Sequence, residues 1–260
     1  MRCILIFFIS LTLAAAAQPD ARAIMTKVEN RDTGNKMKAD LEMVLIDKRS
    51  HKRTRKIRSY SMEQSRDTYT IMFFLKPPDV AGTAFLTYDY DDPKQDDDQW
   101  LYMPALRKVK RIAAGEKSSS FMGSDFNYSD MTAKDTADYD YQLLKETRVR
   151  DHAVWVIKGT PRRQETAAET GYQKSIVFVR QDNYVLVRAV LWVYDSTKRK
   201  FLDVKKLQKI NGIWTALETH MTTKQGSVFI HKTIMKKSNV KYGADINRSW
   251  FTVQKLKQGL

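Results

Sequence analysis

The sequence of 260 residues predicts a mainly β (α+β) protein built on a single antiparallel sheet. Long segments alternate apolar and polar side chains with the two-residue period of a strand that buries one face. Polar turns join successive segments, and Asn211-Gly212 is the clearest of them, because Asn-Gly between two alternating segments is the strongest short signal for a hairpin. Regular helices do not separate these segments, which argues against a parallel βαβ fold.

The N-terminus has the three parts of a secretory signal peptide. Arg2 supplies positive charge, residues 4–13 are apolar, and residues 14–17 are alanines that suit a cleavage site. An apolar run of this length is shorter than the roughly 20 residues that cross a bilayer. We therefore expect cleavage before Gln18, with cleavage after Ala23 as the alternative.

The amino-acid composition restricts the cellular compartment and the classes of binding partner that are expected. Cys3 is the only cysteine and it precedes the apolar run, so the mature chain would contain no disulfide, no cysteine metal ligand and no lipidated cysteine. The formal net charge is +15, or +14 once Arg2 is removed. A basic protein is attracted to nucleic acid or to anionic lipid head groups. Export leaves lipid as the expected partner and excludes nucleic acid.

After the signal peptide at 1–17, residues 18–260 are expected to form one domain. A short helix capped by Asp20 comes first, followed by roughly ten or eleven strands by period-two pattern. Met37 to Leu45 is the first strand, and a third strand ends at Pro77-Pro78. A final helix is expected after Asp245 as its cap. A meander of this length must curl or close to protect its edges.

No catalytic, metal or cofactor site is predicted. The sequence contains neither a Gly-x-Ser-x-Gly elbow nor a His-Glu-x-x-His zinc helix. The histidines lie far apart, without the spacing of metal ligands. They are His51, His152, His220 and His231. The acidic run at 89–98 lacks the glycine and the final glutamate of an EF-hand loop, so we expect a solvated loop there.

Residues 100–131 are rich in aromatic side chains and methionine but have no sustained period. Two interpretations remain open for the aromatic side chains, which would either form the wall of a ligand cavity or fill the core. The basic stretch 107–111 also has two interpretations. It would contact a phosphate head group or an anionic membrane, or it would be a solvated strand face.

Three motifs resemble one known family. They are FLKPPDVAGTAFL at 74–86, DQWLYMPALRKVKRI at 98–112 and SFMGSDF at 120–126. Together they closely resemble the LolA-like, outer-membrane lipoprotein-sorting proteins. The early Ile24-Met25 helix and the late Trp250-Phe251-Thr252 segment fit the same pattern. The resemblance implies an unclosed antiparallel β-barrel with helices that cover its mouth and an apolar cavity between them.

The resemblance also implies a function. The chain would be a periplasmic carrier that binds acyl chains of a lipoprotein or lipid and delivers them toward the outer membrane. This branch of the family is often associated with RND-type exporters. The alternative is therefore a non-catalytic accessory subunit of such an exporter, which would bind protein rather than lipid.

The expected cavity residues come from one parity of each strand and from the aromatic segment. They are Met37, Leu41, Met43, Tyr69, Ile71, Phe73, Trp100, Tyr102, Leu106, Phe121, Met122, Phe126, Val185, Val187 and Leu191. The residues expected to contact a head group or an anionic membrane surface, outside the cavity, are Arg107, Lys108, Lys110 and Arg111.

The signal sequence generates a direct prediction. The mature protein is expected to begin at Gln18 and to be found free of the membrane in the periplasm. N-terminal sequencing of protein purified from the native host measures this. A membrane-bound product that retains Met1 would contradict it.

Overall fold

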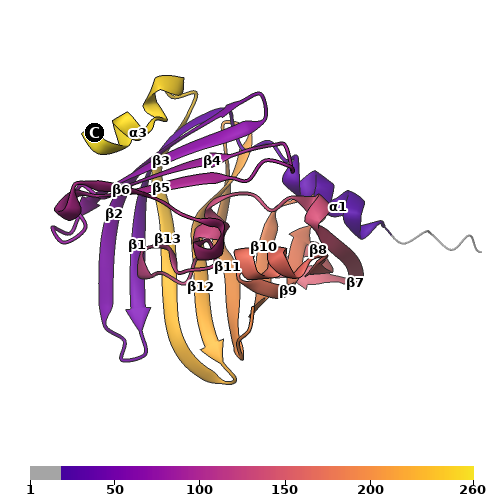
Figure 1. Cartoon of the computed structure of the whole chain (residues 1–260). Helices are drawn as coiled ribbons and strands as arrows, with labels where there is room; N and C mark the ends of the chain where they lie inside the picture. Colours follow the sequence, from indigo (N-terminus) through magenta and orange to yellow (C-terminus); the bar gives the residue numbers. More distant parts are fainter. Residues whose placement is uncertain (1–18) are drawn as a thin grey trace, which may run out of the picture.

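The computed structural model describes residues 19–260, which form one curved antiparallel sheet of thirteen strands, with three α-helices and a long irregular segment (Figure 1). The expected signal peptide lies outside the described residues. The strand count exceeds the expected ten or eleven, in part because a strand as short as Lys108–Arg111 shows too little alternation to be identified.

The elements have the following bounds. The strands are β1 Lys36–Asp47, β2 Lys52–Gln64, β3 Asp67–Lys76, β4 Ala84–Asp89, β5 Asp98–Met103, β6 Lys108–Arg111, β7 Tyr139–Val149, β8 His152–Pro161, β9 Tyr172–Arg180, β10 Leu186–Val193, β11 Lys198–Ile210, β12 Ile213–Gln225 and β13 Val228–Tyr242. The helices are α1 Ala21–Glu29, α2 Gln164–Thr170 and α3 Val253–Gln258. Short 3₁₀ turns lie mainly between β6 and β7.

The strand order is β6-β5-β4-β3-β2-β1-β13-β12-β11-β10-β9-β8-β7. Each strand thus pairs with its neighbour in sequence, except that β1 also pairs with β13 and joins two meanders into one sheet. β6 and β7 are the two edges, and within residues 19–260 they do not pair with each other. The expectation of a single unclosed antiparallel sheet is confirmed, and no closed barrel forms.

The sheet curves around residues 112–138, which connect its two edges and cross its inner side (Figure 1). On that inner side, alternate residues of β1 pack with side chains of β9–β12 and of the crossing segment. β3, β4 and β5 bury both of their faces, because α3 covers their outer face.

The helices agree only in part with expectation. Asp20 caps α1 by accepting hydrogen bonds from the backbone N–H groups of Arg22 and Ala23, as predicted. Asp245 does not cap the last helix, because the backbone from 244 to 252 is irregular and Thr252 accepts from Lys255 N instead. α2 was not predicted, since seven residues are too few to show a helical period.

Leu256 anchors α3 on the outer face. Its side chain is fully buried, in one cluster with Ile71, Phe73 and Phe251. We expect Leu256→Ala to lower the free energy of unfolding by about 2–4 kcal/mol, because it leaves a cavity in that cluster. Urea unfolding of the variant and of the exposed control Leu260→Ala, whose side chain is 56% exposed, measures this. Equal losses in both variants would show that α3 contributes little packing.

Candidate functional site

The inner face of the sheet is an apolar wall. Leu41, Met43 and Leu45 of β1 are at most 5% exposed, and they belong to one buried cluster that extends across the sheet. The other strands contribute side chains that include Ile57, Phe74, Phe85, Ile157, Val177, Val179, Ala189, Leu191 and Met221. Because alternation places one parity of each strand on this side, the wall extends, in the order of the sheet, from β5 to β8.

The crossing segment, residues 112–138, covers this wall. Phe121 is completely buried, and its ring centroid lies 5.0 Å from that of Phe85 and 5.5 Å from that of Tyr128. Phe126 is 8% exposed in the same cluster. Of the two interpretations of these aromatic side chains, the structure agrees with core filling, since both are buried in the inner cluster.

Polar contacts as well as apolar ones hold the crossing segment. The buried carboxylate of Asp125 accepts hydrogen bonds from the hydroxyl groups of Thr223 and Thr233 and from Nδ1 of His231, the last at 2.7 Å. Asp125 N in turn donates to Thr233 Oγ1 at 2.9 Å. The guanidinium of Arg55 donates to the carbonyl of Met122. These partners belong to β12, β13 and β2, so the anchor joins the segment to both meanders.

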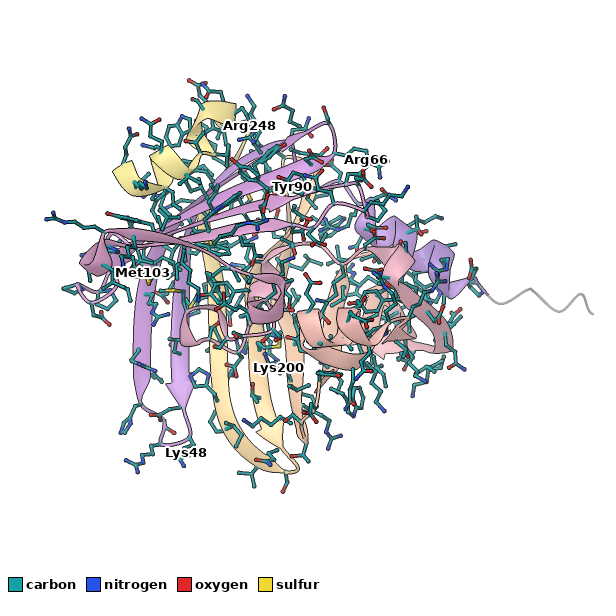
Figure 2. All side chains as sticks on the ribbon, in the orientation of Figure 1. Lys48, Arg66, Tyr90, Met103, Lys200 and Arg248 are labelled. Carbon is teal, nitrogen blue, oxygen red and sulfur yellow. The ribbon has the colours of Figure 1, made fainter. Side chains whose placement is uncertain are left out.

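A second group of polar contacts lies at Lys200, near the centre of Figure 2. Lys200 Nζ donates to Asn127 Oδ1 at 2.6 Å and lies 5.4 Å from the ring centroid of Tyr172. Burial lowers the pKa of Lys200. The hydroxyl of Tyr172 donates to Asp130 Oδ2 at 2.7 Å, and Asn127 Nδ2 donates to the carbonyl of Thr170. Groups buried in this way are costly unless they are paired, and here they are paired.

The Asp125 cluster contains a histidine, a carboxylate and two hydroxyl groups, but not the geometry of a nucleophilic triad. Both threonine hydroxyls donate to the carboxylate rather than to the imidazole. Thr233 is also completely buried. Nucleophilic catalysis needs the hydroxyl bonded to the base and accessible to a substrate. Within residues 19–260 no group of three or more His, Cys, Asp or Glu side chains could hold a metal ion.

A polar cavity of about 840 Å³ opens beside the crossing segment, between the ends of α1 and α2 and the loop from 89 to 97. Its carboxylates are those of Glu29, Asp32, Glu63, Asp89, Asp91, Asp92, Asp96, Asp97, Asp135, Asp138 and Glu169. Its cations are those of Arg31, Arg66, Lys117 and Lys134. This is not the apolar cavity that we expected, because the apolar wall lies under the crossing segment and the hollow lies at its rim.

Asp89 has the most perturbed carboxylate of this cavity. Burial, together with the negative charge of Asp97, raises the pKa of Asp89 to about 7. Its Oδ2 accepts a hydrogen bond from Ala133 N at 2.9 Å, where the crossing segment leaves the inner face. Asp89 therefore takes up a proton near neutral pH at one end of that segment.

The expected cavity residues divide among different faces of the sheet. Leu41, Met43 and Leu191 lie on the inner wall, and Met37 is half-buried on the same side of β1. Tyr69, Ile71 and Phe73 instead face outward, under α3. Their predicted grouping with Leu41 is wrong. Residues that pair across neighbouring strands share a face, and Ile57 pairs with both Leu41 and Phe74. Phe74 therefore faces inward with Leu41, and the alternate residues Tyr69, Ile71 and Phe73 face outward.

The aromatic segment divides in the same way. Trp100 and Tyr102 pack in the outer cluster under α3, opposite to Phe121, so these aromatic side chains do not border one mouth. Met122 is half-buried against the inner wall, and Leu106 is 60% exposed.

Val185 and Val187 join a third cluster, with Val149, Val154 and Val204. The role in ligand binding of all the expected cavity residues stays a prediction.

The basic stretch is partly neutralised. Lys110 pairs with Glu116 at 2.5 Å, and Arg111 pairs with Asp98. Arg107 and Lys108 are exposed. The predicted contact of these four residues with a head group or membrane stays a prediction. Within residues 19–260 no helix is long and apolar enough to cross a membrane.

Sequence reasoning missed the anchor residues. Asp125 and Asn127 are in or beside a quoted motif, but nothing in a single sequence shows that their partners are Thr223, Thr233 and Lys200, about 75–110 positions away. The available signal was that Asp125 is the only charged residue from Ser118 to Ser129, in a segment with several aromatic side chains, since a carboxylate must find partners when it is buried.

Comparisons with known proteins give the following relations. A family model described as an uncharacterized protein matches residues 66–258. No curated protein matches the chain. The structure is similar to a putative outer membrane lipoprotein-sorting protein domain from Vibrio parahaemolyticus, with 28% identity and a TM-score of 0.82 over 91% of this chain and 98% of that one.

Two further solved structures are similar. A DUF1329 family protein from Desulfovibrio piger has 27% identity and a TM-score of 0.80 over 91% of this chain and 97% of that one. A LolA superfamily protein from Nitrosomonas europaea has 18% identity and a TM-score of 0.68 over 90% of this chain and 98% of that one, and at this identity the likeness shows the fold alone.

The raised pKa of Asp89 predicts a pH-dependent stability. The folded state favours the protonated carboxyl, so its stabilising contribution is present below the unfolded pKa of about 4 and is lost as pH rises through about 7. Asp89→Asn removes this loss and keeps an acceptor for Ala133 N. We expect the variant to exceed the wild type in unfolding free energy by on the order of 2 kcal/mol near pH 8, with no such gain near pH 4. Urea unfolding at the two pH values measures this, and an equal gap at both would contradict it.

Proposed function

We propose that this chain, which belongs to a LolA-like family, is a periplasmic carrier whose inner sheet face binds the acyl chains of a lipid or lipoprotein. The observation that carries the proposal is the cover of the inner face. Within residues 19–260 an irregular segment lies directly on the apolar wall, and α1 packs into the same buried cluster only through one face, with Ala21 and Ile24.

The crossing segment makes contacts that an acyl chain would replace. Phe121 and Phe126 lie against Phe85, Met43 and their neighbours in the inner cluster. Each CH₂ group of an acyl chain that is buried there contributes about 0.8 kcal/mol, so a long chain competes well with two aromatic side chains. Displacement of the segment would open the binding site, and its return would expel the cargo.

The polar anchors determine in what fraction of molecules the crossing segment is displaced from the inner face. Hydrogen bonds to a charged group contribute about 1.5–3 kcal/mol each, so the bonds at Asp125 hold the closed state. Only the open fraction of molecules binds cargo, and the apparent affinity is reduced by that fraction. Such a carrier binds acyl chains weakly when it is alone and releases them readily to an acceptor at the outer membrane.

A second candidate is a non-catalytic accessory subunit of an RND-type exporter that binds protein. One observation favours it, since the inner wall is filled by Phe121 and Phe126 and the hollow beside it is lined mostly by carboxylates. The two functions differ in their cargo. Mass spectrometry of protein purified from its native host distinguishes them, because a carrier retains lipid and an accessory subunit retains a protein partner.

The anchor generates a prediction about affinity. Asp125→Asn should weaken the closed state by about 1–2 kcal/mol, and so strengthen the binding of a fluorescent fatty acid about 5- to 30-fold, because a larger fraction of molecules is open. Fluorescence titration measures the dissociation constant.

Asp203→Asn is the matched control. Asp203, on β11, is likewise a carboxylate bound by several side chains, including those of Arg150 and Arg188, but it does not contact the crossing segment. Its variant should bind the probe like the wild type. Unchanged or weaker binding in Asp125→Asn, with the fold intact by circular dichroism, would show that the crossing segment does not cover the site.

A further inference from the structure

Three hairpin ends meet at the end of the sheet far from the polar cavity. The β1–β2 turn at 47–52 lies beside the β12–β13 turn, because Asp47 pairs with His231. The β10–β11 turn lies next in line, because Lys198 pairs with Gln225. These ends form the lower edge of the sheet in Figure 1, and Lys48 marks them in Figure 2.

These turns and the strand residues next to them form what we call the basic end. Its cations are Lys48, Arg49, Lys52, Arg53, Lys198, Arg199, Lys224 and Lys232. Only Asp47 and Asp195 oppose them in these stretches. None of the eight cations forms an ion pair with any residue of the described chain, 19–260. In contrast, two of the four cations at 107–111 are paired.

Apolar side chains are mixed with these cations. Val228, at the β12–β13 turn, is 61% exposed. Trp192, Phe201 and Phe229 are half-buried, and none of them belongs to a hydrophobic cluster of the described core. Lys224 Nζ lies 5.6 Å from the ring centroid of Phe201, and Lys174 Nζ lies 4.6 Å from that of Trp192.

Charge is also separated along the molecule. β1 runs from the rim of the polar cavity, beside Asn35, to the basic end, a length of about 40 Å at 3.3 Å per residue. The cavity has eleven carboxylates and four cations, so one end is acidic and the other is basic. A molecule polarised in this way is oriented by a negative surface, with the basic end toward it.

We propose that the basic end docks the protein on an anionic phospholipid bilayer. Lysine and arginine side chains are attracted to anionic head groups, and tryptophan and other apolar side chains enter the interfacial region. Nucleic acid would use the cations but has no place for an exposed valine between them. This inference concerns how the molecule meets a membrane, and it stands whether or not the inner face carries acyl chains.

Leu106 and Val228 allow a direct comparison of two surfaces. Leu106 is 60% exposed beside the basic stretch at 107–111, and Val228 is 61% exposed at the basic end. An environment-sensitive fluorophore is attached to Leu106→Cys or Val228→Cys, each with Cys3→Ser, and mixed with phosphatidylcholine vesicles with or without phosphatidylglycerol. We expect a blue shift only for the label at 228 and only with phosphatidylglycerol. A shift at 106 alone, or at neither position, would overturn the proposal.

Charge removal tests the cations themselves. A lysine near an anionic bilayer contributes a factor of about five in affinity, so Lys224→Gln with Lys232→Gln should weaken vesicle binding roughly 30-fold. Lys206→Gln with Lys209→Gln is the matched control, since both lysines are exposed, unpaired within residues 19–260 and outside the basic end. The control pair should bind vesicles like the wild type. Equal losses in both pairs would show an effect of net charge alone.

Duplex DNA in place of vesicles distinguishes the other class of partner. We expect weak DNA binding that the two pairs of substitutions reduce equally. Tight DNA binding that depends on Lys224 and Lys232, together with vesicle binding that does not, would overturn the membrane proposal and assign the basic end to nucleic acid.

Discussion

The pairing of β1 with β13 is the interaction on which the rest of the structure depends. It joins a meander of six strands to a meander of seven, although β1 and β13 lie at opposite ends of the described sequence. Each meander alone would expose an apolar face, whereas the joined sheet curves and brings both faces around one interior. The crossing segment connects the two edges of the sheet and packs Phe121 and Phe126 into that interior.

The way in which the crossing segment is held is compatible with the proposed carrier, which must be stable when closed and must also open. Its apolar residues fill the interior, but its fixed points are polar, at Asp125 and Asn127. Apolar contacts tolerate exchange for other apolar groups of similar volume, such as acyl chains. Hydrogen bonds to a buried carboxylate do not, because they need their own partners. The segment therefore combines replaceable packing with specific anchors.

The distribution of charge gives the molecule an acidic end and a basic end. The net charge of +15 describes the whole sequence, but the folded protein concentrates carboxylates around the polar cavity and unpaired cations at the hairpin ends. This separation follows from the antiparallel meander, since every second turn lies at the same end of the sheet. Turns that are rich in lysine, such as 47–52, are gathered together although they are distant in sequence.

The sequence by itself determined the class of fold, the antiparallel hairpins, the α1 helix with its Asp20 cap and the resemblance to a LolA-like family. These depend on local periodicity, on turn residues and on contiguous motifs, which a single chain displays directly. Only the tertiary structure decided which parity of each strand faces inward. Alternation separates Phe73 from Phe74, but only the pairing of Ile57 with both Leu41 and Phe74 shows that Phe74 is the one that faces inward. For the same reason the filled interior, the anchor at Asp125 and the basic end became visible only in the folded molecule, because each depends on contacts between residues that are distant along the chain.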